Sequence, residues 1–178
     1  MLLRCSHLRW QHGRRSRYGT GILAHNYRLE RSQLIAHPRS EVFAFFADAA
    51  NLERLTPEFL HFQIETPLPI EMRAGALIDY RLSLAGLPVR WRTRISSWEP
   101  PLRFSDDQER GPYALWHHVH EFEAVGDQTR MRDRVDYRLP FGPLGALAHV
   151  LSVRRTLERI FNHRRKVIEE LFGTSPEG

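Results

Sequence analysis

Three histidines in one predicted strand, His117, His118 and His120, are the residues of this sequence most able to do acid–base or metal chemistry. Strand alternation puts His118 and His120 on one face and His117 on the other. We expect Asp133 in the next strand to lie opposite His120, where its carboxylate would fix the imidazole tautomer for proton transfer. The alternative is a buried polar pair that only satisfies its own hydrogen bonds. No Ser or Cys nucleophile accompanies the pair, so a catalytic triad is not supported and no catalytic residue is assigned beyond these two candidates.

A metal site would need more ligands than this part of the sequence supplies. Zinc sites use three or four protein ligands. Besides His118 and His120, only Asp133 can be assigned to the same face. We therefore expect no metal and no other cofactor.

The positions of these residues follow from a predicted hairpin of residues 114–124 and 129–139. The turn Val125-Gly126-Asp127-Gln128 makes a four-residue loop, which places Ala124 opposite Thr129. One face of the hairpin is then mainly aromatic and apolar, and the other carries opposite charges across the ladder. The predicted pairs are Trp116–Tyr137, His118–Val135, His120–Asp133, Phe122–Met131, Glu123–Arg130 and Glu121–Arg132.

Five further strands are predicted from alternating apolar residues, with Pro or Gly turns between them. They cover residues 29–36, 60–66, 77–85, 89–98 and 102–110. Two short helices, at residues 41–47 and 48–55, are expected between the first and second strands, and Asp48 caps the second helix.

The last long segment, residues 143–172, is predicted to be one amphipathic helix. Arg154 and Arg164 lie at the borders of its apolar face, where their stems would be buried; alternatively, Arg154 recognises an anionic head group. Leu147 and Leu151 point about a quarter turn away, and they either line a cavity entrance or follow the twist of the sheet. The apolar face consists of Val150, Val153, Leu157, Ile160, Phe161, Ile168, Leu171 and Phe172.

This order of elements predicts an α+β fold, in which a curved antiparallel sheet of about seven strands wraps around a long C-terminal helix. A curved sheet cannot contact one helix along its whole length, so we expect a cavity between them. Residues 28–174 are predicted to form this single domain, between disordered tails at 1–27 and 175–178.

Five segments carry a resemblance to a known superfamily. They are Pro38-Arg39-Ser40-Glu41-Val42-Phe43, Asn51-Leu52-Glu53-Arg54-Leu55-Thr56-Pro57, Trp116-His117-His118-Val119-His120-Glu121-Phe122, Asp133-Arg134-Val135-Asp136-Tyr137 and Pro140-Phe141-Gly142-Pro143-Leu144-Gly145. Residues 28–173 resemble the START-like or Bet v 1-like helix-grip superfamily (SRPBCC), which includes the polyketide cyclase/dehydrase and lipid transport proteins. The resemblance is also to a bacterial subgroup fused to, or encoded beside, nucleotide-sugar-epimerase-like proteins, which implies such a protein as a partner.

The resemblance implies an apolar or amphipathic ligand between the sheet and the long helix, and aromatic walls with a few polar groups are typical of such pockets. The residues expected to bind it are Tyr80, Trp91, Trp116, His118, His120, Asp133, Tyr137, Leu147, Leu151 and Arg154.

The positive charge of the chain lies mainly in its first 28 residues. Six of the 26 basic residues precede the first acidic one, Glu30, and the remaining 20 face 21 acidic residues. The domain is therefore nearly neutral, and nucleic acid is not an expected partner. No apolar run is long enough to span a membrane. We expect a cytoplasmic protein, with an organelle address in the basic segment as the alternative.

Three functions are consistent with these features. The leading hypothesis is a binding or carrier protein for a small hydrophobic or amphipathic ligand such as a lipid, quinone or polyketide-like molecule. The second is a cyclase or dehydratase that uses His120 and Asp133 as acid and base. The third is an interaction module that docks an acidic partner or a membrane surface.

Overall fold

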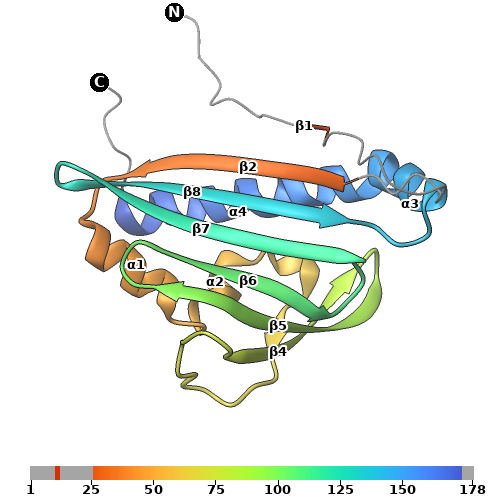
Figure 1. The fold of residues 1–178 in the computed structure, drawn as a ribbon, viewed down its shortest axis with the longest axis horizontal. Coiled ribbons are helices and arrows are strands. Elements are labelled where there is room, and N and C mark those ends of the chain that lie inside the picture. Colours follow the sequence, from red (N-terminus) through yellow and green to blue (C-terminus); the bar gives the residue numbers. More distant parts are fainter. Residues whose placement is uncertain (1–10, 13–25, 174–178) are drawn as a thin grey trace, which may run out of the picture.

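A computed structural model of the chain describes residues 11–12 and 26–173, and these form one antiparallel sheet with helices packed on its concave side (Figure 1). The sheet order is β1-β2-β8-β7-β6-β5-β4-β3. The strands are β1 Gln11–His12, β2 Asn26–Ile35, β3 Gln63–Ile64, β4 Leu77–Leu84, β5 Leu87–Glu99, β6 Arg103–Arg110, β7 Leu115–Val125 and β8 Gln128–Arg138. The helices are α1 Arg39–Ala47, α2 Asn51–Leu55, the 3-10 turn Glu58–Leu60, α3 Pro143–Ala148, a π-helical turn His149–Val153 and α4 Arg154–Phe172.

This architecture confirms the predicted α+β fold. Two short helices follow the first long strand, six strands follow them, and the long helix ends the domain. The predicted tails at 1–27 and 175–178 lie outside the described residues, except for β1 and the first two residues of β2. Residue 174, predicted to end the domain, also lies outside them.

The β7–β8 hairpin has the predicted register. Trp116 pairs with Tyr137 and His120 with Asp133, and the opposite charges meet on the outer face. The turn is tighter than expected, because Val125 and Gln128 also pair. Only Gly126 and Asp127 remain in the loop, and Gly126 adopts a positive φ of 59°, which glycine tolerates without steric cost.

The strand predicted over residues 60–66 is wrong in extent, since only β3 is paired there. A 3-10 turn occupies residues 58–60 after Pro57, and Pro67 has no N–H to continue the ladder. The prediction that Asp48 caps the second helix is wrong, because α2 begins later and its N-cap residue is Ala50, without a side-chain capping hydrogen bond. Asp48 Oδ1 instead accepts a hydrogen bond of 2.9 Å from the backbone N–H of Ala50, before the helix begins.

The long helix is continuous but not uniformly α-helical. Its π-helical turn inserts one extra residue and rotates the preceding segment relative to α4. His149 is therefore buried against Tyr137 and Tyr27, with its Nε2 2.8 Å from the Tyr137 hydroxyl and its ring stacked 3.6 Å from that of Tyr27. Val150, predicted to lie on the buried face, is 67% exposed, and Leu171 in the last turn is 38% exposed.

The buried face of α4 is formed by Leu157, Phe161 and Ile168. Ile168 packs in a core with α1, β7 and β8, whereas Leu157 and Phe161 pack in a second core with β2 and β8. In Figure 1, α4 runs behind β2, β8 and β7, while β4, β5 and β6 curve away from it. The helix is therefore anchored on one half of the sheet.

Alanine substitutions test the phase change at the π-helical turn. Ile168→Ala should lower the free energy of unfolding by about 2–5 kcal/mol, because it leaves a cavity in the core. Val150→Ala should change it by no more than about 0.5 kcal/mol, because that side chain is in solvent. Urea unfolding followed by circular dichroism measures the free energy of unfolding of both variants. Equal losses of stability would contradict the assignment of Ile168 to the buried face and Val150 to the exposed face of the helix.

Candidate functional site

A cavity of about 190 Å³ lies between the concave face of the sheet, the α2 region and α4. Its walls come mainly from β4, β5 and β7 on the sheet side and from α4 opposite them. Most of the wall is aromatic or aliphatic, with Phe62, Tyr80, Trp91, Tyr113, Trp116 and Phe161 among the lining residues.

The polar atoms of the aromatic wall already form hydrogen bonds with one another. The indole N–H of Trp91 donates to Thr93 Oγ1 at 3.0 Å, and the Tyr80 hydroxyl lies 3.1 Å from the same oxygen. Trp116 stands edge-on to Trp91, with ring centroids 5.3 Å apart. Burial raises the pKa of Tyr80, so its hydroxyl stays neutral. This side of the cavity therefore presents mainly aromatic rings to a ligand, together with the hydrogen-bonded hydroxyl groups of Tyr80 and Thr93.

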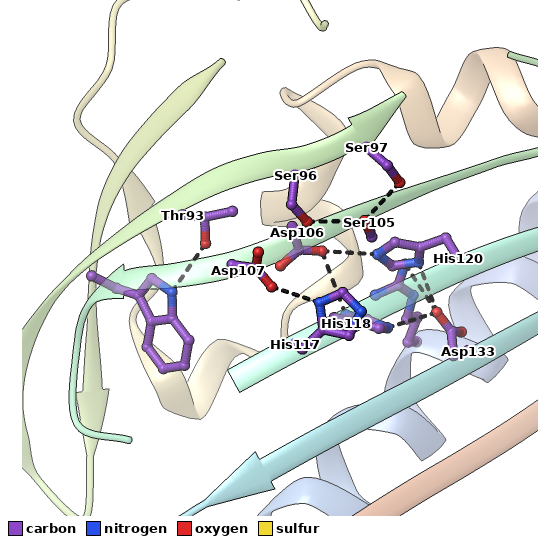
Figure 2. A network of polar contacts seen from close by, with 12 residues as sticks. Thr93, Ser96, Ser97, Ser105, Asp106, Asp107, His117, His118, His120 and Asp133 are labelled. Carbon is purple, nitrogen blue, oxygen red and sulfur yellow. Dashed lines mark hydrogen bonds and ion pairs between the residues drawn. The ribbon is translucent and has the colours of Figure 1, made fainter. Parts of the chain in front are cut away.

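The opposite end of the cavity is polar. We call Asp106, His118, His120, Asp133 and Arg164 the His–Asp cluster. His118 Nε2 and His120 Nδ1 lie 2.9 Å and 2.8 Å from the same oxygen, Asp133 Oδ1. His120 Nε2 lies 3.2 Å from Asp106 Oδ2. Figure 2 shows His120 held between the two carboxylates.

Arg164 completes the cluster from the helix. Its Nη2 is 3.9 Å from Asp133 Oδ1, and its guanidinium lies over the ring of Phe46 at 5.0 Å. The side chain is only 13% exposed, so the predicted position at the border of the helix face, with a solvated end, is wrong. Arg154 does lie at the surface, where it pairs with Glu158 at 3.2 Å.

The environment sets different charges on the two imidazoles. Burial, together with the charge of His120, lowers the pKa of His118 to about 4. Burial would also lower the pKa of His120, but its hydrogen bonds with Asp106 and Asp133 outweigh burial and raise it. Burial would raise the pKa of each carboxyl; contacts with His120 and Arg164 lower both instead. Below the raised pKa of His120, two carboxylates are balanced by His120 and Arg164, while His118 is neutral.

His117 points to the outer face, as strand alternation predicts. Its Nδ1 lies 2.6 Å from Asp107 Oδ1, and both side chains are about one-third exposed. The same two strands, β6 and β7, thus carry one His–Asp pair in solvent and another in the cavity wall (Figure 2).

Of the ten residues predicted to bind a ligand, five line this cavity: Tyr80, Trp91, Trp116, His118 and His120. Asp133 lies behind the two histidines and faces a second cavity of about 210 Å³, between β2, β8 and α4. Phe161 and Arg164 line both cavities and so stand between them.

The remaining four predicted residues lie elsewhere. Tyr137 is fully buried and is bonded to His149. Leu147 and Leu151 are 56% and 64% exposed, and with Arg154 they are outside the walls of both cavities. The π-helical turn accounts for Leu147 and Leu151, because it changes the phase of the helix so that Gly145 and His149 are the buried residues of its first part.

Two members of the cluster were not anticipated, although the sequence holds a signal for each. Asp106 is two residues from the buried Phe104 in β6 and therefore shares its face. Arg164 is three residues after Phe161 and four before Ile168, so it falls within the buried stripe and not beside it.

Comparisons with known proteins give the family and the fold of the chain. The family model for polyketide cyclase/dehydrase and lipid transport matches residues 35–162. The chain belongs to this family. A search of curated proteins finds no significant match.

Solved structures of the family's fold superpose on most of the chain. Zhui aromatase/cyclase from Streptomyces sp. R1128 has a TM-score of 0.66 and 16% identity over 83% of this chain and 93% of its own. A protein from Thermus thermophilus has a TM-score of 0.65 and 19% identity over 80% and 94%. Norcoclaurine synthase of Thalictrum, solved as a point mutant with a transition-state analogue, has a TM-score of 0.60 and 11% identity over 85% and 99%. At such identities the likeness establishes a shared fold and not a shared activity.

The predicted partner and the absence of a membrane-spanning segment are the remaining expectations from the sequence. The epimerase-like partner finds no support in the comparisons. Within the described part of the chain, none of the helices combines the length and the hydropathy required to cross a membrane.

The pKa of His118 predicts a loss of stability in mild acid. Unfolding restores its ordinary pKa of 6.5, so between pH 6.5 and about 4 the unfolded chain takes up a proton that the folded protein excludes. Stability should fall across this range by up to about 3 kcal/mol. His120 does not oppose this slope, because a raised pKa leaves it protonated in both states there and its contribution is lost only at higher pH. The lowered pKa values of Asp106 and Asp133 act below their ordinary value of 3.8.

His118→Gln should flatten this part of the profile, since Gln does not titrate. Urea unfolding at several pH values between 4 and 7, in the wild type and in this variant, measures the difference. Parallel profiles would show that His118 is not the group responsible.

Proposed function

We propose that this protein binds and carries a small, largely apolar ligand in the cavity between the sheet and α4. The observation that supports the proposal is the make-up of the cavity, which has an aromatic wall and a single polar end. Burial of apolar ligand surface would supply most of the affinity, at about 25 cal/mol per Å² before the cost of association.

The polar end would set the orientation of the ligand. Asp106, His118 and His120 all line the cavity, and the two imidazoles differ as hydrogen-bonding groups, because the pKa of His118 is lowered and that of His120 is raised. An amphipathic molecule with one hydroxyl, carbonyl or carboxyl group fits this arrangement better than a pure hydrocarbon. The family description, which names lipid transport beside polyketide chemistry, supports ligands of this kind.

Native mass spectrometry of the purified protein, followed by solvent extraction, tests the proposal directly. A bound lipid, quinone or polyketide-like molecule is the expected result. The apolar fluorescent probe anilinonaphthalene sulfonate then reports whether added ligand enters the cavity, and an extracted ligand should displace it.

Two matched tryptophans locate the binding site. Trp116→Ala should weaken probe binding at least about tenfold, because losing about 1.4 kcal/mol of apolar contact has that effect. Trp98→Ala removes a similarly half-buried ring from the same sheet, but Trp98 packs in the core and does not line the cavity. It should leave the affinity of the folded protein nearly unchanged. Calorimetry in which His120→Gln weakens binding more than Trp116→Ala would contradict an apolar-dominated site.

A second candidate is an acid–base enzyme of the cyclase or dehydratase class. It is favoured by one observation, the pair of imidazoles that face an apolar cavity with a carboxylate behind them. In that case His120→Gln should abolish conversion of the extracted ligand or of a β-polyketone test compound, detected as loss of water by mass spectrometry, while probe affinity persists. Conversion that continues in the variant would remove His120 from the mechanism.

A further inference from the structure

We propose that Asp106, His118 and His120 form a binding site for a divalent transition-metal ion, Zn²⁺ or a close relative, in the wall of the cavity. This goes beyond the carriage of an apolar ligand, and it can be tested with the metal alone. The sequence predicted no metal because a third ligand beside the two histidines was missing. The structure supplies it from β6, where Asp106 pairs with His118 across the ladder.

The donor atoms already converge. One ligand atom from each of the three residues lies within 4.8 Å of the others. Asp106 Oδ2 is 3.2 Å from His120 Nε2 and 3.8 Å from His118 Nδ1. Ligands about 2.0–2.1 Å from a tetrahedral zinc ion are about 3.3–3.4 Å apart, so side-chain shifts of about 1 Å would place all three on one ion.

The nitrogens that do not face this point are fixed by a single carboxylate. His118 Nε2 and His120 Nδ1 both lie within 2.9 Å of Asp133 Oδ1. Histidines that bind metals almost always donate their other ring N–H to a carboxylate or carbonyl group, which sets the tautomer and the orientation of the ring. Here Asp133 faces one nitrogen of each ring, and Arg164 Nη2 also lies 3.4 Å from His120 Nδ1. The other two nitrogens, His118 Nδ1 and His120 Nε2, face Asp106 Oδ2.

The electrostatic surroundings also suit a cation. Asp106 and Asp133 bring two carboxylates to a buried site, and Arg164 lies 3.9 Å from one of them, Asp133. An ion would replace the present contact of 3.2 Å between His120 Nε2 and Asp106 Oδ2.

The ligand set indicates the class of metal and its use. Two imidazoles and a carboxylate suit zinc, iron, cobalt or nickel, whereas calcium and magnesium prefer oxygen ligands alone. Three protein ligands leave at least one coordination position open, as in catalytic zinc sites. All three residues line the cavity, so the open position faces the space in which a ligand oxygen would lie.

Titration of the full-length, chelator-treated protein with Zn²⁺ in a calorimeter tests the site. The wild type should bind one ion tightly within the cavity wall. Asp106→Asn and His118→Gln should each remove this binding event, and Asp133→Asn should weaken it about 10–100-fold, because it orients the ligands without touching the ion.

The outer-face pair provides a matched control. Asp107→Asn and His117→Gln alter a His–Asp pair on the same strands, but on the solvent side, and both should bind Zn²⁺ as the wild type does. This comparison separates the cavity site from adventitious binding by the other histidines of the chain. Equal affinity in the cavity variants and the wild type, or no binding by the wild type, would overturn the proposal.

A second measurement does not depend on the variants folding. The X-ray absorption spectrum of the wild-type zinc complex should show two imidazole ligands with oxygen completing the shell. Coordination by one imidazole, by none, or by sulfur would equally overturn the assignment.

Discussion

A single helix can lie against a strongly curved sheet over only part of its face, and the rest of this structure depends on that mismatch. The buried side chains of α4, Leu157, Phe161 and Ile168, pack mainly against α1, β2, β7 and β8. Strands β4 and β5 curve away, and their inner side chains meet the α2 region and each other instead. The cavity is thus the space left between these strands and α4, and its largely aromatic lining keeps that space mainly apolar.

The His–Asp cluster lies where this space meets the packed core. Burying four ionisable groups and an arginine is costly, and a set of apolar residues of similar volume would often be at least as stable. Stability alone therefore does not account for the cluster. Four members, Asp106, His118, His120 and Arg164, line the cavity, and Asp133 lies behind the two histidines, an arrangement that fits the recognition and coordination roles proposed above.

The features that sequence reasoning recovered are those fixed by local rules. The β7–β8 register follows from one short turn and a two-residue period, so His120 and Asp133 could be paired correctly. Asp106 depends on the register between β6 and β7, whose connection gives no comparable signal, and on β5–β6 pairing that is shifted twice. The π-helical turn escaped prediction because its residues have ordinary helix propensities, and Val150 was accordingly assigned to the wrong face. Arg164 was placed at a border because a charged side chain is normally excluded from a buried stripe.

The sharing of Asp133 Oδ1 by two imidazoles has a consequence for how this family can diverge. Replacing any one of Asp106, His118, His120, Asp133 or Arg164 leaves an uncompensated charge or an unpaired polar atom in the interior, whereas replacing all of them by apolar residues does not. A lineage that abandons the site must therefore cross a destabilised intermediate. Relatives should accordingly fall into two groups, those that inherit the five residues together and those that have exchanged them for an entirely apolar wall.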